Sequence, residues 1–216
     1  MYDIYEHIDP KVAERIELLN LQNQLNVIEA LVEILLTHTG PDGHGKAPPP
    51  DELALLALHR EATQFLLSDS GQYRTSGVEV KTGKRRTFDP PDASEVPTLM
   101  RNFFRELQAF WPRADGISAA AFSLWRINWI HPFANGNGRT ARAFAYACLC
   151  IKAEHLLAGR KLIIDVMRNN AVFYKKYLLA LKKADKNTER PNLIPMSQLL
   201  QDLADIQLKS RYKAHK

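Results

Sequence analysis

Residues 117–151 have the sequence ISAAAFSLWRINWIHPFANGNGRTARAFAYACLCI. Residues 117–130 are apolar on nearly every face, and a second apolar run continues from Arg142 through Phe144 and Leu149 to Ile151. A helix that is apolar all round belongs in the centre of a bundle. The polar, glycine-containing segment His131–Arg142 separates the two runs. The stretch therefore predicts two central helices joined by a polar loop, in an all-α fold.

The remaining helices are predicted from apolar spacing and helix-start signals. The first begins at Asp9-Pro10, a favourable cap and first position, and carries an apolar stripe that includes Val12, Ile16, Leu19 and Ile28 up to Gly40. Residues 40–50, GPDGHGKAPPP, form a breaker-rich linker. Further helices are expected at 51–67, from Ser94 as cap to 110, at 165–183 and at 195–212. We therefore predict an N-terminal helical segment and linker, 1–50, and a main domain, 51–216.

The segment between the second and third helices has a different character. Residues 77–88, GVEVKTGKRRTF, contain short β-type runs on either side of Gly83, and Asp89-Pro90-Pro91 follows them. This pattern predicts a small two-stranded hairpin.

Composition excludes several classes of protein. The chain has 216 residues, a net charge of +5 and a pI near 9.2. We expect no membrane-spanning helix, because no apolar run reaches about 18 residues. We expect no secretory signal, because the N-terminal sequence MYDIYEHIDPKV has neither a basic start nor an apolar run. Cys148 and Cys150 are expected to be core thiols of a cytoplasmic protein. The positive charge fits an anionic ligand, whereas no DNA-binding module is recognisable, so DNA binding is not expected.

The loop between the central helices carries the residues of an anion site. Gly136 and Gly138 let the backbone approach a ligand without an intervening Cβ. The next helix begins near Asn137, and its first N–H groups point into the turn. Arg139 and Arg142 lie on one face of the first helical turns. Positive charge at a helix N-terminus interacts unfavourably with the helix dipole and costs about a few tenths of a kcal/mol. A bound polyphosphate would offset that cost.

His131 precedes the glycine turn and is the candidate general base. An imidazole with a pKa near 6.5 accepts a proton from a hydroxyl at physiological pH. Phosphoryl-type transfer needs an anion cradle, charge neutralisation and a positioned nucleophile. The loop supplies the first two and a base for the third.

The segment His131–Arg142 resembles the signature of the Fic family, H-P-F-x-[D/E]-G-N-G-R-x-x-R. The matching positions are His131, Pro132, Phe133, Gly136, Asn137, Gly138, Arg139 and Arg142. The resemblance extends over roughly residues 70–185, including Gly71-Gln-Tyr-Arg74, residues 96–100 and residues 177–181. It implies a Fic-type helical bundle with a β-hairpin flap.

The resemblance also implies an activity, the transfer of AMP from ATP with Mg²⁺ to a Tyr, Thr or Ser hydroxyl of a target protein. His131 would deprotonate the hydroxyl, and Gly136, Asn137 and Gly138 would form the anion hole. Arg139 and Arg142 would pair with the β- and γ-phosphates. Val78, Glu79 and Val80 in the flap would hold the target segment by strand-like pairing.

The sequence departs from the family pattern at two points. Asn135 stands where Asp or Glu holds Mg²⁺, so a weaker metal site is expected, with the nucleotide phosphates as the main ligands. The family's inhibitory motif, [S/T]-x-x-x-E-[G/N], is also absent. Glu29 is the nearest candidate, but Leu25 and Ala30 break the pattern. Either a separate antitoxin-like chain supplies inhibition or regulation differs.

Other functions stay open on the sequence alone. The same scaffold would serve transfer of phosphate or UMP, and Asn135 also suits a degenerate module that binds nucleotide without turnover. The target protein and the oligomeric state, a homo-oligomer included, are not written in the chain.

Overall fold

The computed structural model describes residues 7–37, 47–82 and 85–210. The helices found there are α1 (Pro10–Thr37), α2 (Glu52–Thr63), α3 (Val96–Phe110), α4 (Gly116–Ile130), α5 (Asn137–Ala153), α6 (Ile163–Asn169), α7 (Ala171–Ala184) and α8 (Ile194–Lys209), with 3-10 turns η2 (Ala93–Glu95) and η3 (Trp111–Arg113). Two short strands, β1 (Val80–Thr82) and β2 (Arg85–Phe88), lie between α2 and α3. The predicted all-α class is therefore confirmed.

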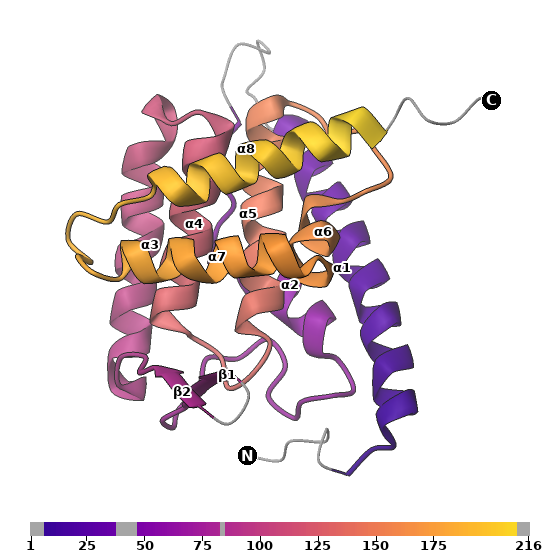
Figure 1. The fold of residues 1–216 in the computed structure, drawn as a ribbon, viewed down its shortest axis with the longest axis vertical. Helices are drawn as coiled ribbons and strands as arrows, with labels where there is room; N and C mark the ends of the chain where they lie inside the picture. The colour runs from indigo at the N-terminus through magenta and orange to yellow at the C-terminus, as the bar shows by residue number, and fades with distance from the viewer. Residues whose placement is uncertain (1–6, 38–46, 83–84, 211–216) are drawn as a thin grey trace.

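The two predicted central helices, α4 and α5, run antiparallel through the middle of the molecule (Figure 1). α3 packs on α4, while α1 and α2 pack on α5. α7 and α8 run across one face of these upright helices, and α6 contacts both α5 and α8. The loop that joins α4 to α5 and the small hairpin lie at the same end of the molecule, the lower end in Figure 1.

Small side chains are frequent in the two central helices. Ala119, Ala120 and Ala121 of α4 are buried, as are Ala141, Ala143, Ala145 and Ala147 of α5. The larger aromatic residues Phe144, Phe103 and Phe133 are fully buried in the same core. The joining loop lies at one end of this packed pair.

The hairpin forms where the sequence predicts β-structure. β1 and β2 pair antiparallel, with Val80 opposite Phe88 and Thr82 opposite Arg85, and the register shifts between Val80 and Lys81. The two residues at the tip, Gly83 and Lys84, lie outside the described residues.

The predicted apolar stripe of α1 is wrong in its first half. Val12 and Leu19 are exposed, at 47% and 66% of their accessible surface, and the buried face instead carries Ala13, Asn20 and Gln24. Asn20 Nδ2 donates to the carbonyl of Gln64 and Gln24 Nε2 to that of Leu58, both at 2.8 Å. Polar side chains therefore dock this half of α1 on α2. In the second half Ile28 and Val32 join the common core.

Helix ends depart from prediction at three other places. The segment 165–183 is two helices, because Asn170 leaves the helical region and caps α7 by accepting from Val172 N and Phe173 N. Asp92, not Ser94, begins the turn before α3, and its N–H donates to Glu95 Oε2 at 3.2 Å. α2 ends at Thr63 instead of 67, and Phe65 beyond it has a positive φ.

The two cysteines are buried free thiols of α5, as predicted. Burial raises the pKa of Cys148 to about 12, so it stays protonated in the core. Among the helices that the structure describes, none is both long and apolar enough to cross a membrane.

Candidate functional site

Hydrogen bonds within the loop fix its shape between α4 and α5. Asn137 turns its side chain inward, where Oδ1 accepts from Phe133 N at 2.9 Å and Nδ2 donates to Phe133 O at 2.8 Å. Both backbone groups of the buried Phe133 are thereby satisfied. Asn137 thus offers only its backbone N–H to a ligand, and its side chain is the brace of the loop.

The imidazole of His131 is held in one tautomer at the end of α4. Its backbone adopts the left-handed conformation, φ 53° and ψ 56°, which ends the helix. Nδ1 lies 3.2 Å from the carbonyl oxygen of Asn128. Because a carbonyl only accepts, Nδ1 carries the hydrogen and Nε2 keeps its lone pair. Burial lowers the pKa of His131 to about 4, so the ring is neutral at pH 7.

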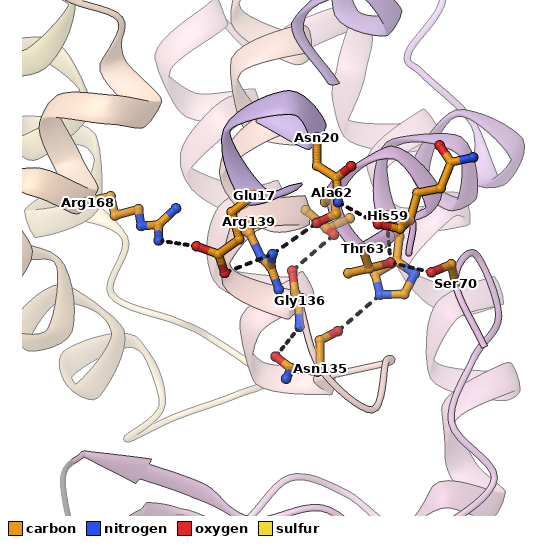
Figure 2. Close-up of polar contacts among 12 residues, drawn as sticks. Glu17, Asn20, His59, Ala62, Thr63, Ser70, Asn135, Gly136, Arg139 and Arg168 are labelled. Carbon is orange, nitrogen blue, oxygen red and sulfur yellow. Dashed lines mark hydrogen bonds and ion pairs between the residues drawn. The ribbon is translucent and has the colours of Figure 1, made fainter. Parts of the chain in front are cut away.

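A second histidine, His59 of α2, supports the loop from behind. Its ring stacks on Phe133 with centroids 3.7 Å apart and planes 3° from parallel. Gly71 N donates to Nδ1 at 2.8 Å, so Nε2 carries the hydrogen and donates to the carbonyl of Asn135 at 3.0 Å (Figure 2). Burial lowers the pKa of His59 to about 4. Nδ1 can accept from Gly71 N while Nε2 donates to Asn135 only when the ring is neutral.

Gly136 lies against α2 so closely that no other residue fits. Its φ is +78°, and a Cβ there would approach Thr63 Cγ2 to 2.6 Å and His59 Nε2 to 3.3 Å. Its carbonyl accepts from Thr140 N and Thr140 Oγ1, which starts α5 immediately after the turn. The first N–H groups of α5, which have no acceptor within the helix, consequently face the loop.

The predicted site residues surround one cleft of about 630 Å³. Its walls include His131, Asn135, Gly136, Asn137, Gly138, Arg139 and Arg142, joined by Glu79 and Val80 of the hairpin. Val78 is not part of the lining. Burial lowers the pKa of Arg142, and repulsion from Arg168 and Arg139 lowers it further. The cleft thus combines a helix N-terminus, a neutral imidazole and clustered guanidiniums, the set that an anionic phosphate ester requires.

Arg74 ties the base of the hairpin to the loop. This buried side chain donates from Nε to the His131 carbonyl at 2.7 Å and from Nη2 to the Pro91 carbonyl at 2.6 Å. Its own N–H donates to the Pro132 carbonyl at 2.9 Å. The hairpin is therefore set at a fixed distance from His131.

Asn135 does not present its side-chain oxygen to the cleft as an unused metal ligand. Oδ1 accepts from Gly136 N at 2.7 Å. Within residues 7–37, 47–82 and 85–210, no cluster of three or more His, Cys, Asp or Glu side chains is placed to hold a metal ion. Asn135 therefore offers a cation a neutral carbonyl oxygen in place of a carboxylate, and the phosphates of a nucleotide would supply the main ligands of a Mg²⁺ ion.

Two residues that the sequence did not single out complete the arginine end of the cleft. Glu17 of α1 places Oε1 3.4 Å from Arg139 Nη1 and Oε2 3.1 Å from Arg168 Nη2 (Figure 2). Arg139 also donates to the Ala62 carbonyl at 3.0 Å. Glu29, the candidate weighed from the sequence, is exposed on the far half of α1. Separations of 122 and 151 residues conceal these pairs from sequence patterns.

Comparison with known proteins agrees with the resemblance drawn from the loop. The model of the Fic/DOC family matches residues 49–149, which span the loop, α2 to α4 and most of α5. The family resemblance is thereby confirmed for this part of the chain. A search of curated proteins gives no match.

Solved structures of Fic proteins share the fold over most of the chain. A Fic family protein from Desulfovibrio desulfuricans G20 is 19% identical, with a TM-score of 0.59 over 97% of this chain and 68% of that one. BepC, a VirB-translocated effector of Bartonella tribocorum with bound AMPPNP, is 18% identical, with a TM-score of 0.59 over 90% and 87%. C. elegans Fic-1 is 16% identical, with a TM-score of 0.61 over 95% of this chain and 54% of that one. The chain thus spans about half of the Fic-1 structure.

Proposed function

We propose that the chain is a protein adenylyltransferase that transfers AMP from ATP to a Tyr, Thr or Ser hydroxyl of another protein. The observation that carries the proposal is the lone pair of His131 Nε2 in a cleft that also contains the α5 N-terminus, Arg139 and Arg142. AMPPNP bound to BepC, a protein of the same fold, supports a nucleotide as the ligand.

The reaction follows from these positions. The phosphates lie over the first turn of α5, where the N–H groups of Asn137 and Gly138 and the two arginines stabilise their charge. The target oxygen attacks the α-phosphorus while His131 Nε2 accepts its proton. A P–O bond forms to the α-phosphorus, the bond to the β-phosphate oxygen breaks, and pyrophosphate leaves. Mg²⁺ would enter with the nucleotide, bound by its phosphates.

The hairpin provides the surface for the target. Glu79 and Val80 line the cleft, and an extended target segment pairs with the main chain next to them, β1 being an edge strand. Because Arg74 fixes the hairpin relative to His131, a hydroxyl on that segment reaches Nε2 in one geometry. Main-chain pairing depends only weakly on the side chains of the target. A docking site formed by Val78, Glu79 and Val80 would therefore accept targets of different sequence.

Labelling of a cell lysate tests the proposal. With α-phosphate-labelled ATP, wild type is expected to label a protein band, and His131→Ala to reduce the rate by at least about a hundredfold through loss of the base. Ser197 lies in α8 and lines a groove at the opposite end of α4 and α5, so Ser197→Ala is the matched control and should label like wild type. Mass spectrometry of the band identifies the modified residue. Labelling by γ-phosphate-labelled ATP alone would contradict adenylylation and indicate phosphate transfer.

A second candidate is a module that binds nucleotide without turnover. The engaged side chain of Asn135, in place of a carboxylate, favours it. Calorimetric binding of ATP with no labelling from α-labelled ATP or UTP would support this reading.

A further inference from the structure

The outer side of α1 carries a stripe of exposed side chains along most of its length. α1 lies along one edge of the molecule and packs on α2 and α5 with its other side (Figure 1). Residues three or four apart share one face of a helix, and the stripe follows that spacing. The members of this outer stripe, all exposed, are Lys11, Arg15, Leu18, Gln22, Asn26, Glu29 and Glu33. The other charged residues of α1, Glu14 and Glu17, line a cavity next to α6 and are not part of it.

Charge is divided between the two ends of the outer stripe. Its basic members, Lys11 and Arg15, lie in the first two turns of α1, and its acidic members, Glu29 and Glu33, lie in the last three turns. In the part of the chain that the structure describes, none of these four side chains takes part in an ion pair. Each end of the outer stripe therefore presents charge of one sign to the solvent.

This distribution of charge is unfavourable for α1 by itself. Lys11 and Arg15 are like charges four residues apart, and such pairs repel each other on a helix. The same holds for Glu29 and Glu33. Positive charge near a helix N-terminus and negative charge near its C-terminus also oppose the helix dipole, and α1 has no acidic residue in its first turn and no basic residue in its last. A second helix that placed opposite charges against both ends would offset these effects.

The outer stripe is complementary to itself when its direction is reversed. The steps between its members are 4, 3, 4, 4, 3 and 4 residues, which read the same in both directions from Gln22. About a twofold axis at Gln22, an antiparallel second copy of α1 places its Glu33 opposite Lys11. The same axis places Glu29 opposite Arg15, and each pair occurs twice. An interface between two identical chains related by a twofold axis requires self-complementarity of this kind.

We propose that the chain forms a symmetric dimer through the outer stripe, with the two copies of α1 antiparallel and Gln22 next to the axis. This inference does not depend on the proposed function, because no member of the outer stripe lines the cleft. Leu18, 63% exposed, supplies an apolar contact and lies opposite Asn26 of the second copy. One helix pair with a stripe about 33 Å long forms a small interface, so we expect dissociation in the micromolar range.

Sedimentation equilibrium at a series of protein concentrations tests the inference. The wild-type mass is expected to rise from that of the monomer, 24.6 kDa, toward twice that value as the concentration increases. Lys11→Glu with Arg15→Glu places like charges at all four contacts and should weaken dimerisation at least about tenfold. Adding Glu29→Lys and Glu33→Lys to that variant makes every contact attractive again and should restore the wild-type affinity within about threefold.

Cysteine crosslinking tests the direction of the two helices. The Gln22→Cys thiol lies next to its own copy across the axis, so mild oxidation should link the dimer through a disulfide. Arg15→Cys faces Glu29 and should not link to itself. The native thiols of Cys148 and Cys150 are buried and do not compete. Equal linking of the two variants would contradict the antiparallel arrangement.

A matched control separates this interface from general effects of charge. Arg101 and Arg105 are exposed, four residues apart on α3, at the opposite side of the molecule from α1 (Figure 1). Arg101→Glu with Arg105→Glu should therefore dimerise like wild type, and circular dichroism shows that each variant keeps its helices.

Three results would overturn the inference. The first is a monomer mass for wild type at every concentration. The second is dimerisation that Lys11→Glu with Arg15→Glu leaves unchanged, which would mean that another face forms the interface. The third is failure of the quadruple charge reversal to restore a dimer that the double reversal had weakened, which would mean that the charged ends do not face each other.

Discussion

A cleft lies at each end of the α4–α5 pair, and the larger of the two has fewer side chains suited to binding an anion or to catalysis. The cleft at the α5 N-terminus measures about 630 Å³ and the groove at the opposite end about 860 Å³. The groove is lined by Leu149, Leu193, Ile194 and other residues, with Lys152 as its basic side chain and no histidine. The cleft gathers three arginines and an oriented imidazole. Convergent charge, rather than volume, distinguishes the candidate site.

The same helix pair imposes different demands at its two ends. At the cleft, the turn from α4 to α5 needs two positive φ angles, at His131 and Gly136, and every polar group of Phe133 is paired. At the groove, α4 begins at Gly116 with a side-chain cap from Asp115, and α5 ends at Glu154, which also has a positive φ of 60°. The two ends differ in the glycine turn and in the pairing of Phe133, which occur at the cleft alone.

The largest expected effect is a contrast between two glycines. Gly136→Ala should destabilise the fold by about 3 kcal/mol and abolish ATP binding, because a positive φ and a 2.6 Å approach to Thr63 both oppose a Cβ. Gly116→Ala should stay within about 1 kcal/mol, since its Cβ meets the flexible end of Leu149 at 2.9 Å. Urea unfolding and calorimetry measure both. Similar losses for the two variants would remove the contrast.

The fold and the loop were predictable from sequence for a physical reason. The apolar faces of 117–130 and 143–151 and the glycine turn are local patterns, and the loop chemistry follows from neighbours in the chain. The residues from distant parts of the chain that hold the loop and α1 in place were not predictable. His59 lies 76 residues from Asn135, and buried Asn20 and Gln24 occupy positions where an apolar stripe is the usual expectation. Asn170 resembles an ordinary helical residue until its side chain caps α7.

The imidazoles of His59 and His131 make the stability of the fold depend on pH. Both have a pKa near 4 in the fold, against 6.5 in the unfolded chain. Between pH 6.5 and 4 the unfolded chain binds more protons, so the free energy of unfolding falls as the pH falls and is flat above 6.5. Each imidazole contributes on the order of 3 kcal/mol.

Replacing one imidazole measures its contribution to the pH dependence of the free energy of unfolding. His59→Gln should roughly halve the loss of stability between pH 6.5 and 4.5, as measured by urea unfolding at each pH. Ser197→Ala in the opposite groove should follow wild type. Identical slopes for wild type and His59→Gln would mean that His59 is protonated in the fold and does not support the loop as described.

The smallest effect is expected at the cap of α4. Asp115 Oδ1 accepts from Ser118 N at 2.6 Å, so Asp115→Ala should cost about 1 kcal/mol in urea unfolding. Because Asp115 lines the groove and not the cleft, ATP affinity should stay the same. A change in affinity would show that the two ends of the helix pair are coupled.

The uneven docking of α1 has a consequence for motion. Its first half is held by amide side chains and leaves Leu18 and Leu19 in water, whereas its second half inserts Ile28 and Val32. Local opening costs least where few apolar contacts are lost. Amide hydrogens of residues 13–24 should therefore exchange with deuterium well before those of 28–36. The first half of this continuous helix would then open locally while the second half stays packed in the core.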